Sequence, residues 1–193
     1  MERWEEIEKK AYPILEERIK KNTDEIMSYY LQHEVEIQTE FVKTIFQGLK
    51  ESKKRKKEIQ YILISMLNSS IVTKSYEYEM AFYDNRFYLD ENPICLYFKL
   101  KFLFDFFEED MKGLKKKLGG CVIRLQEYEV NEIGKEYVLN YYALGTVLLK
   151  QMAEQSFLVL GEMKEEVVSS LSKDVVILFG RYMEKPMKLW GKE

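Results

Sequence analysis

SYEYEMAFYDNRFYLDENPICLYFKLKFLFDFFEEDMKGLKKKLG, residues 75–119, is the stretch with the highest density of aromatic side chains. The chain has 14 Tyr, 11 Phe and 2 Trp, and 12 of these rings fall within residues 76–107. Large aromatic side chains bury more apolar surface than other residues. We therefore expect this stretch to supply the centre of the hydrophobic core.

The first part of the stretch predicts a β-hairpin. Residues 76–82 alternate between apolar and polar side chains, which is the pattern of a half-buried strand. Asp84 and Asn85 follow, and both residue types tolerate the left-handed conformation that a two-residue turn needs. In this register Phe82 lies opposite Phe87 and the large apolar residues of both strands share one face.

The second part predicts a long helix. Asn92 and Pro93 suit a helix start, and Gly119 suits a helix end. Apolar side chains recur between them at helical spacing as far as Leu118. A strand is the alternative for residues 94–106, because the apolar side chains there also alternate without a break. The helix is preferred because its pattern continues into the charged part of the segment.

The remaining segments mostly show helical spacing. Residues 121–130 fit a strand or an extended connection, and residues 175–179 fit an edge strand as well as a helix. The other predicted elements are an opening helix bent at Pro13, a helix from about residue 22 to 49 with Asn22 and Glu25 as a capping box, a short buried helix at 59–67, a third long helix at 131–160, and two shorter helices at 163–171 and 175–183.

These elements predict a mainly α fold. It is a multi-helix bundle with three long helices and one inserted β-hairpin at about residues 75–90. If residues 94–106 form a strand, the fold is α+β with a small antiparallel sheet. The length of 193 residues and the 46% hydrophobic content are typical of one globular domain, which we expect to span residues 1–193.

Composition also limits the location and the cofactors. The N-terminus has no apolar segment of the secretory kind, and the longest uncharged run, residues 59–73, is too short to span a membrane, so we expect a cytoplasmic protein without membrane contact. His33, Cys95 and Cys121 are too few for a structural zinc site. No metal and no cofactor is predicted, and both cysteines are expected to be buried reduced thiols.

Glu34 is the first candidate site residue. On a helix it lies near the middle of the apolar arc, and Gln38 follows one turn later on the same face. A carboxylate in that position must be paired, hydrogen-bonded or protonated. Glu34 and Gln38 therefore form a candidate ligand-binding or acid/base site, although satisfaction by a core partner is the more common reason for such a residue.

The aromatic rings of the hairpin are the second candidate. Tyr76, Tyr78, Phe87 and Tyr88 would form a partner-binding face if they were exposed, and a hairpin edge also favours self-association. Packing in the core is the more frequent role for such rings. A homo-oligomer, with a further protein partner as a possibility, is the predicted assembly.

The third candidate is a basic run that follows the second predicted helix. It consists of Lys53, Lys54, Arg55, Lys56 and Lys57, which would grip phosphates in a nucleic acid. The chain carries a formal charge of −3 and has no helix-turn-helix or RNA-recognition signature, so a solvated run is preferred and nucleic acid is not the expected partner.

No catalytic motif supports an enzyme. The sequence has no GxGxxG, no GxxxxGK[ST], no GxSxG and no HExxH. The leading hypothesis is a non-enzymatic protein-interaction or scaffolding domain that works as a homo-oligomer. A small-molecule site at Glu34 and Gln38 and nucleic-acid association through residues 53–57 are the alternatives.

Overall fold

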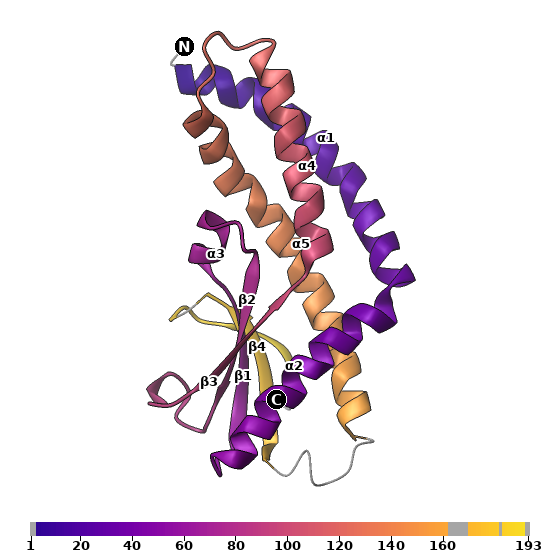
Figure 1. The fold of residues 1–193 in the computed structure, drawn as a ribbon, viewed down its shortest axis with the longest axis vertical. Helices are drawn as coiled ribbons and strands as arrows, with labels where there is room; N and C mark the ends of the chain where they lie inside the picture. The colour runs from indigo at the N-terminus through magenta and orange to yellow at the C-terminus, as the bar shows by residue number, and fades with distance from the viewer. Residues whose placement is uncertain (1–2, 162–169, 182, 192–193) are drawn as a thin grey trace. The chain divides into compact units, whose positions relative to one another are not determined.

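The computed structural model describes residues 3–161, 170–181 and 183–191, and its fold is α+β (Figure 1). A five-stranded mixed sheet replaces the predicted helical bundle with one hairpin, so that prediction was wrong. The elements are α1 (Arg3–Gln32), α2 (Glu34–Lys54), β1 (Ile59–Met66), α3 (Asn68–Val72), β2 (Glu77–Tyr83), the 3-10 turn η1 (Phe87–Leu89), β3 (Ile94–Lys99), α4 (Lys101–Gly119), α5 (Glu127–Gly161), β4 (Leu171–Gly180) and β5 (Met187–Gly191).

The chain divides into two compact units. The helical unit comprises Met1–His33 and Lys101–Gly145, and the sheet unit comprises Glu34–Leu100 and Thr146–Glu193. The helical unit holds α1, α4 and the first half of α5, whereas the sheet unit holds α2, all five strands and the later turns of α5. Each unit takes two segments of the chain, and the predicted single domain over residues 1–193 stays a prediction.

In the helical unit, α1 runs as one helix through Pro13, where a bend was predicted, and through Asn22, where a second helix was predicted to begin. A proline inside a helix leaves the carbonyl four residues earlier without its N–H partner. Pro13 and Lys9 are both exposed, so water can satisfy that carbonyl. The helix ends instead at Gln32, and the N–H of His33 donates to the carbonyl of Tyr29 at 3.0 Å.

The strand order of the sheet is β3-β2-β1-β4-β5. The central pair, β1 and β4, is parallel, with Ile62 opposite Ile177, and the other pairs are antiparallel. Residues 59–67 were predicted as a short helix, which was wrong. A strand in the middle of a sheet is buried on both faces, so β1 is apolar nearly throughout and lacks the alternation that identifies a half-buried strand.

A hairpin does form, with a different partner strand. Phe82 of β2 lies opposite Ile94 of β3, so the predicted pairing of Phe82 with Phe87 was wrong. Residues 94–106 are divided between the two alternatives, because β3 ends at Lys99 and α4 begins at Lys101. The Phe-rich start of α4 continues the alternation of the strand, and no glycine or proline marks the change.

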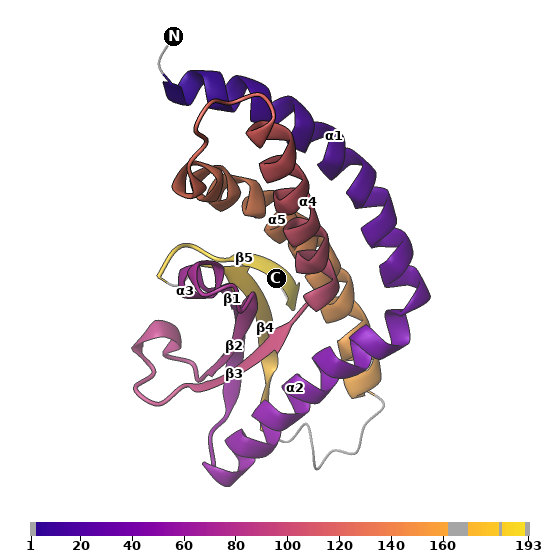
Figure 2. The same ribbon diagram turned by 45° about the horizontal axis from the view of Figure 1, so that its top comes forward.

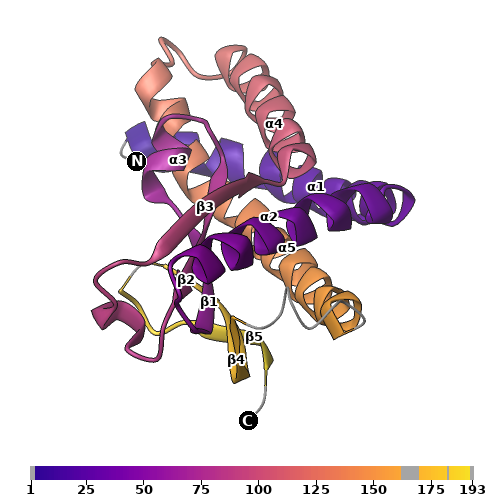
Figure 3. The ribbon, with the colours of Figure 1, turned by 60° about the horizontal axis from the view of Figure 1, so that its bottom comes forward.

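One face of the sheet packs against α2, which crosses the strands in Figure 3. Phe82 points to this face and approaches α2 at Gly48, where a Cβ atom would lie 2.1 Å from the ring. The ring of Phe41 meets that of Phe98 edge-on, with centroids 5.6 Å apart. Phe82 and Phe41 are almost fully buried, so this layer holds the core of the sheet unit.

The opposite face is covered in part by the connection between β2 and β3, which Figure 2 shows at one end of the sheet. Leu63, Ala81 and Tyr83 are buried on this face, and Phe87 and Tyr88 of the connection pack against them. The two connecting rings have centroids 4.1 Å apart. The connection is therefore anchored to the sheet by its own aromatic side chains.

The structure also decides the segments left open by the sequence. Residues 121–126 form turns, and α5 begins at Glu127. β4 pairs with a strand on each side, so residues 175–179 are neither a helix nor an edge strand. Most of the helix predicted at 163–171 lies outside the described residues.

Candidate functional site

A polar cleft of about 650 Å³ lies at the end of the sheet where β1 begins and β2 ends. One wall comes from the link between α2 and β1, and the other from the connection between β2 and β3. We call it the polar cleft. Its lining residues are Arg55, Lys56, Lys57, Glu58 and Gln60 on the first wall, and Asp84, Asn85, Arg86, Asp90 and Asn92 on the second.

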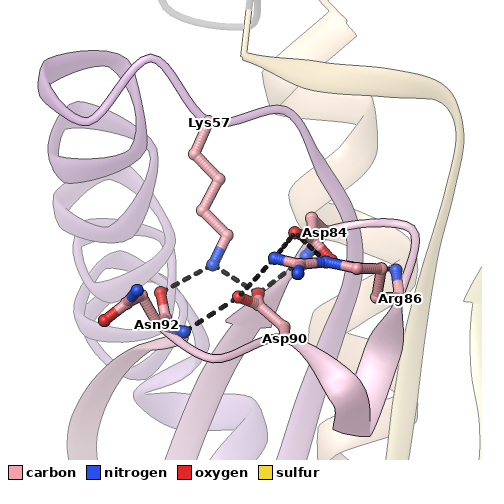
Figure 4. Close-up of polar contacts among 5 residues, drawn as sticks. All are labelled: Lys57, Asp84, Arg86, Asp90 and Asn92. Carbon is pink, nitrogen blue, oxygen red and sulfur yellow. Dashed lines mark hydrogen bonds and ion pairs between the residues drawn. The ribbon is translucent and has the colours of Figure 1, made fainter.

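Asp90 organises the cleft, as Figure 4 shows. Its carboxylate is buried and forms an ion pair with Lys57, and it accepts hydrogen bonds from the backbone N–H groups of Asp84 at 3.0 Å and Asn92 at 3.1 Å. The ammonium group of Lys57 also donates to the carbonyl of Asn92 at 2.7 Å. One carboxylate thus fixes both ends of the connection and joins it to the opposite wall.

The charge of Asp90 is stabilised by these donors. Burial alone raises the pKa of the carboxyl group, but the hydrogen bond from Lys57 and those from the two backbone N–H groups outweigh it. The pKa of Asp90 therefore lies below its ordinary value, and the group is ionised at neutral pH. A carboxylate held in this state positions cations and is a poor proton donor.

Arg86 is oriented by a second carboxylate. Its guanidinium group donates to Asp84 through Nε at 3.1 Å and Nη2 at 2.9 Å, and Nη2 also lies 3.8 Å from Oδ1 of Asp90. The hydrogen bond from Arg86 lowers the pKa of Asp84. Nη1 of Arg86 has no hydrogen-bond partner among the described residues. The two aspartates therefore hold Arg86 and Lys57 on opposite walls of one cleft.

The cleft has a surplus of positive charge. Four cationic side chains line it against three carboxylates. Lys56 is exposed and has a φ of 54°, a left-handed conformation that turns the chain between α2 and β1. The arrangement favours an anion, because cations already oriented by the protein lose little side-chain entropy when they bind one.

A second depression, of about 430 Å³, runs between α2 and β3. We call it the edge groove, because β3 is the outermost strand on its side of the sheet. Leu96 is half-buried in it, and Cys95 is exposed. Its lining residues are Gln47, Lys50, Glu51, Lys54 and Arg55 of α2 and the following turn, with Ile94, Cys95 and Leu96 of β3.

The edge groove is also positively charged. Lys50, Lys54 and Arg55 face a single carboxylate, that of Glu51. Glu51 accepts hydrogen bonds from Arg55 at 3.1 Å and Lys54 at 3.2 Å, which lower its pKa. Arg55 lines both the edge groove and the polar cleft, so the two share one cationic rim.

Glu34 and Gln38 are together, as their spacing requires, and both contact the later turns of α5. Gln155 donates to Glu34 at 2.6 Å, and the side-chain amide of Gln38 donates to the hydroxyl of Ser156 at 2.8 Å. The Oε1 atoms of Gln38 and Gln155 are buried and accept no hydrogen bond from the described residues. The role of Glu34 and Gln38 as a ligand site stays a prediction.

The four hairpin rings do not share one surface. Tyr78 is fully buried and stacks on Phe98, with ring centroids 5.4 Å apart, and Tyr76 is almost fully buried. Phe87 and Tyr88 are half-buried on the opposite face of the sheet. On β3 it is Tyr97, with 54% exposure, that faces solvent.

The basic run is also divided by the structure. Lys53 and Lys54 end α2 and are exposed, whereas Lys57 is inside the cleft, with only 11% of its side chain exposed. Arg55 and Lys56 lie between them on the rim of the cleft. Only part of the run therefore belongs to the solvated segment predicted from sequence.

Sequence reasoning missed the opposite wall of the cleft. Asp84 was identified only as a turn residue, and its side chain does accept the N–H of Arg86 at 2.8 Å, as aspartates in turns do. Asp90 and Arg86 had no assigned role. The pairing of Lys57 with Asp90 joins distant parts of the sequence, so no local pattern indicates it.

Two further features concern membranes and metals. None of the described helices is long and apolar enough to cross a membrane. Over the same residues, no three His, Cys, Asp or Glu side chains are grouped to hold a metal ion. Cys95 and Cys121 are both exposed and unbridged, so the prediction of buried thiols was wrong.

Comparisons with family models, curated proteins and solved structures found no match for this chain.

Proposed function

We propose that this chain is a non-enzymatic protein-interaction module that binds an extended, acidic segment of a partner protein in the edge groove. The segment adds to the free edge of β3 as a further strand and lies against α2. The observation that carries the proposal is the groove itself, which places an edge strand beside a row of lysine and arginine side chains.

Strand addition fits the geometry of this edge. An edge strand presents backbone N–H and C=O groups that an extended peptide can pair with, and side-chain pockets beside it supply specificity. Leu96 offers an apolar contact on the groove side of β3, and Lys50 and Lys54 offer positive charge on α2. A segment that alternates apolar and acidic side chains complements both walls.

Charge favours a foreign segment over a second copy of the chain. The residues of β3, ICLYFK, contain a lysine and no carboxylate, so a second β3 brings no acidic group to the edge groove. The homo-oligomer predicted from sequence is therefore the competing occupant of the same edge. The cytoplasmic location also stays a prediction.

Fluorescence anisotropy with a labelled nine-residue peptide of alternating glutamate and valine tests the proposal. We expect saturable binding that Lys54→Glu weakens by about fivefold, the effect of reversing one exposed charge. Lys53→Glu makes the same change of charge on a residue that does not line the groove, and should leave the affinity unchanged. Equal losses of peptide affinity in the two variants would show that the peptide is attracted by the overall charge and is not bound in the groove.

Two further controls separate strand addition from other modes of association. The same peptide methylated on every backbone nitrogen keeps its charge but has no N–H group to donate to a strand, so it should bind far more weakly and should not slow amide exchange in β3. Light scattering on the free protein should give a monomer. A dimer whose β3 amides are already protected from exchange would show that a second copy occupies the edge, and would overturn the proposal.

A further inference from the structure

The polar cleft has a feature that the edge groove lacks, namely cations already oriented from two walls. Lys57 is held by Asp90 and by the carbonyl of Asn92, and Arg86 is held by Asp84. These contacts use two of the three hydrogens of the Lys57 ammonium group. They also leave Nη1 of Arg86 without a hydrogen-bond partner in the described structure.

This donor set matches a terminal phosphate. An arginine oriented by a carboxylate can present its remaining N–H groups to a second anion, and a lysine adds a point charge. A phosphate monoester carries close to two negative charges at neutral pH and has three acceptor oxygens. A phosphodiester has only two such oxygens. Because Asp90 and Asp84 balance the charges of Lys57 and Arg86, it is the remaining N–H donors on the two walls that favour the monoester.

The volume of about 650 Å³ exceeds the needs of a phosphate group alone and lies in the range of small-molecule sites. Gln60 and Asn85 line the same cleft and offer uncharged amide groups to the rest of a ligand. We propose that the polar cleft binds the terminal phosphate group of a small phosphate monoester between Lys57 and Arg86.

The residues that carry this proposal differ from those that carry the peptide proposal, although Arg55 lines both depressions. Arg86 and Lys57 do not line the edge groove, and Lys54 does not line the polar cleft. Lys54→Glu should therefore weaken peptide binding and leave phosphate binding unchanged, whereas Arg86→Met should do the reverse. Failure of one proposal can thus be distinguished from failure of the other.

The test is an NMR titration of the folded protein at low salt with inorganic phosphate, ribose 5-phosphate and dimethyl phosphate. The backbone amides of Lys57, Asn85 and Arg86 should shift and saturate with the first two ligands. Dimethyl phosphate should bind at least about tenfold more weakly, because it offers one charged acceptor oxygen fewer for a charge-assisted hydrogen bond.

Variants locate the site. Arg86→Met should weaken phosphate binding by about tenfold, and Lys57→Met by at least as much. Lys53→Met removes an exposed charge of the same basic run from outside the cleft and should have an effect below about twofold. Since Arg86 is exposed, Arg86→Met should stay folded even if Lys57→Met does not. Equal binding of the diester, or binding unaffected by Arg86→Met, would overturn the proposal.

Discussion

The hydroxyl group of Tyr137 donates a hydrogen bond to Oδ2 of Asp110 across 2.5 Å and ties α5 to α4 inside the helical unit. The same oxygen accepts from Tyr141 at 2.6 Å and from Asn22 of α1 at 2.9 Å, while Oδ1 accepts from Arg18 of α1 at 2.9 Å. Asp110 is buried, and these donors compensate for the loss of its hydration. One carboxylate therefore joins three helices.

Removing that carboxylate should destabilise the protein strongly. Asp110→Ala leaves the charge of Arg18 and several buried donors without an acceptor, and we expect a loss of about 3–5 kcal/mol in the free energy of unfolding. Urea unfolding followed by circular dichroism measures it. Asp105→Ala, an exposed aspartate of the same helix, is the matched control and should cost about 0.5 kcal/mol or less. Similar losses at both positions would contradict the importance of the network.

The two tyrosines of this network should make the protein sensitive to alkaline pH. Burial, and then the hydrogen bond to Asp110, raise the pKa of Tyr137 and of Tyr141 above the ordinary value of 10. A raised pKa in the folded state means that their contribution is fully present below pH 10, and that it is lost as pH rises, because the unfolded chain releases these protons first.

Absorbance of tyrosinate at 295 nm checks this expectation. Of the 14 tyrosines, Tyr137 and Tyr141 should ionise together with loss of the helical circular dichroism signal. Replacing both by Phe should remove their share of the slope of unfolding free energy against pH above 10. If these two tyrosines titrate near pH 10 in a protein that is still folded, the buried network is absent in solution.

Gly48 is the point on α2 at which the Phe82 ring of β2 comes close to the helix backbone. A Cβ atom there would lie 2.1–2.5 Å from three atoms of the Phe82 ring, which is fully buried and has little room to move. Gly48→Ala should therefore cost about 1–3 kcal/mol from overpacking, offset by about 1 kcal/mol of helix propensity. In a protein that already carries Phe82→Leu, Gly48→Ala should raise the stability instead of lowering it, because the overpacking is relieved and the gain in helix propensity remains.

The control for this experiment is Gly119→Ala at the end of α4, where an added Cβ would meet no atom within 4 Å. Thermal unfolding of Gly48→Ala, Phe82→Leu, the double variant and Gly119→Ala measures these differences in stability. A gain in stability from Gly48→Ala alone would show that the approach of α2 to β2 is looser than described.

Asp90 should make a pH-dependent contribution to stability. Its pKa is lowered in the folded state, so its contribution is present above the ordinary pKa near 4 and is lost as pH falls through the lower, folded-state value. Asp90→Asn should thus cost about 2 kcal/mol at pH 6 and much less at pH 2.5. Glu91→Gln, at the exposed neighbouring position, should leave the free energy of unfolding unchanged at both pH values. A difference that does not depend on pH would contradict the ionised state of Asp90.

The sequence was informative where the pattern of burial was one-sided. The helix at α5 was predicted because Ile133, Tyr137 and Val138 recur at helical spacing, and all three are buried. The alternation at the start of β2 was recognised for the same reason, because Tyr78 and Met80 are buried and Glu77 and Glu79 are only half-buried. One-sided burial produces a period, and a period can be read from one sequence.

The sheet was missed because its central strand has no such period. β1 is covered on both faces, so Ile62, Leu63 and Ile64 follow one another without a polar interruption. Its partner β4 is distant in the chain, and parallel pairing is not marked by a turn. The cleft was missed for a related reason, since the contact between Lys57 and Asp90 depends on where two connections meet.

The parallel pairing of β1 with β4 also has a consequence for the order of folding. Ile62 of β1 cannot pair with Ile177 of β4 until that residue has been synthesised, more than 100 residues later. Until then the nascent sheet can contain only β1, β2 and β3. The edge of β1 that later pairs with β4 is exposed during this time, and an unpaired edge of an apolar strand promotes aggregation. Chaperone dependence of the growing chain, and late formation of the pairs that involve β4, are the expected results of this topology.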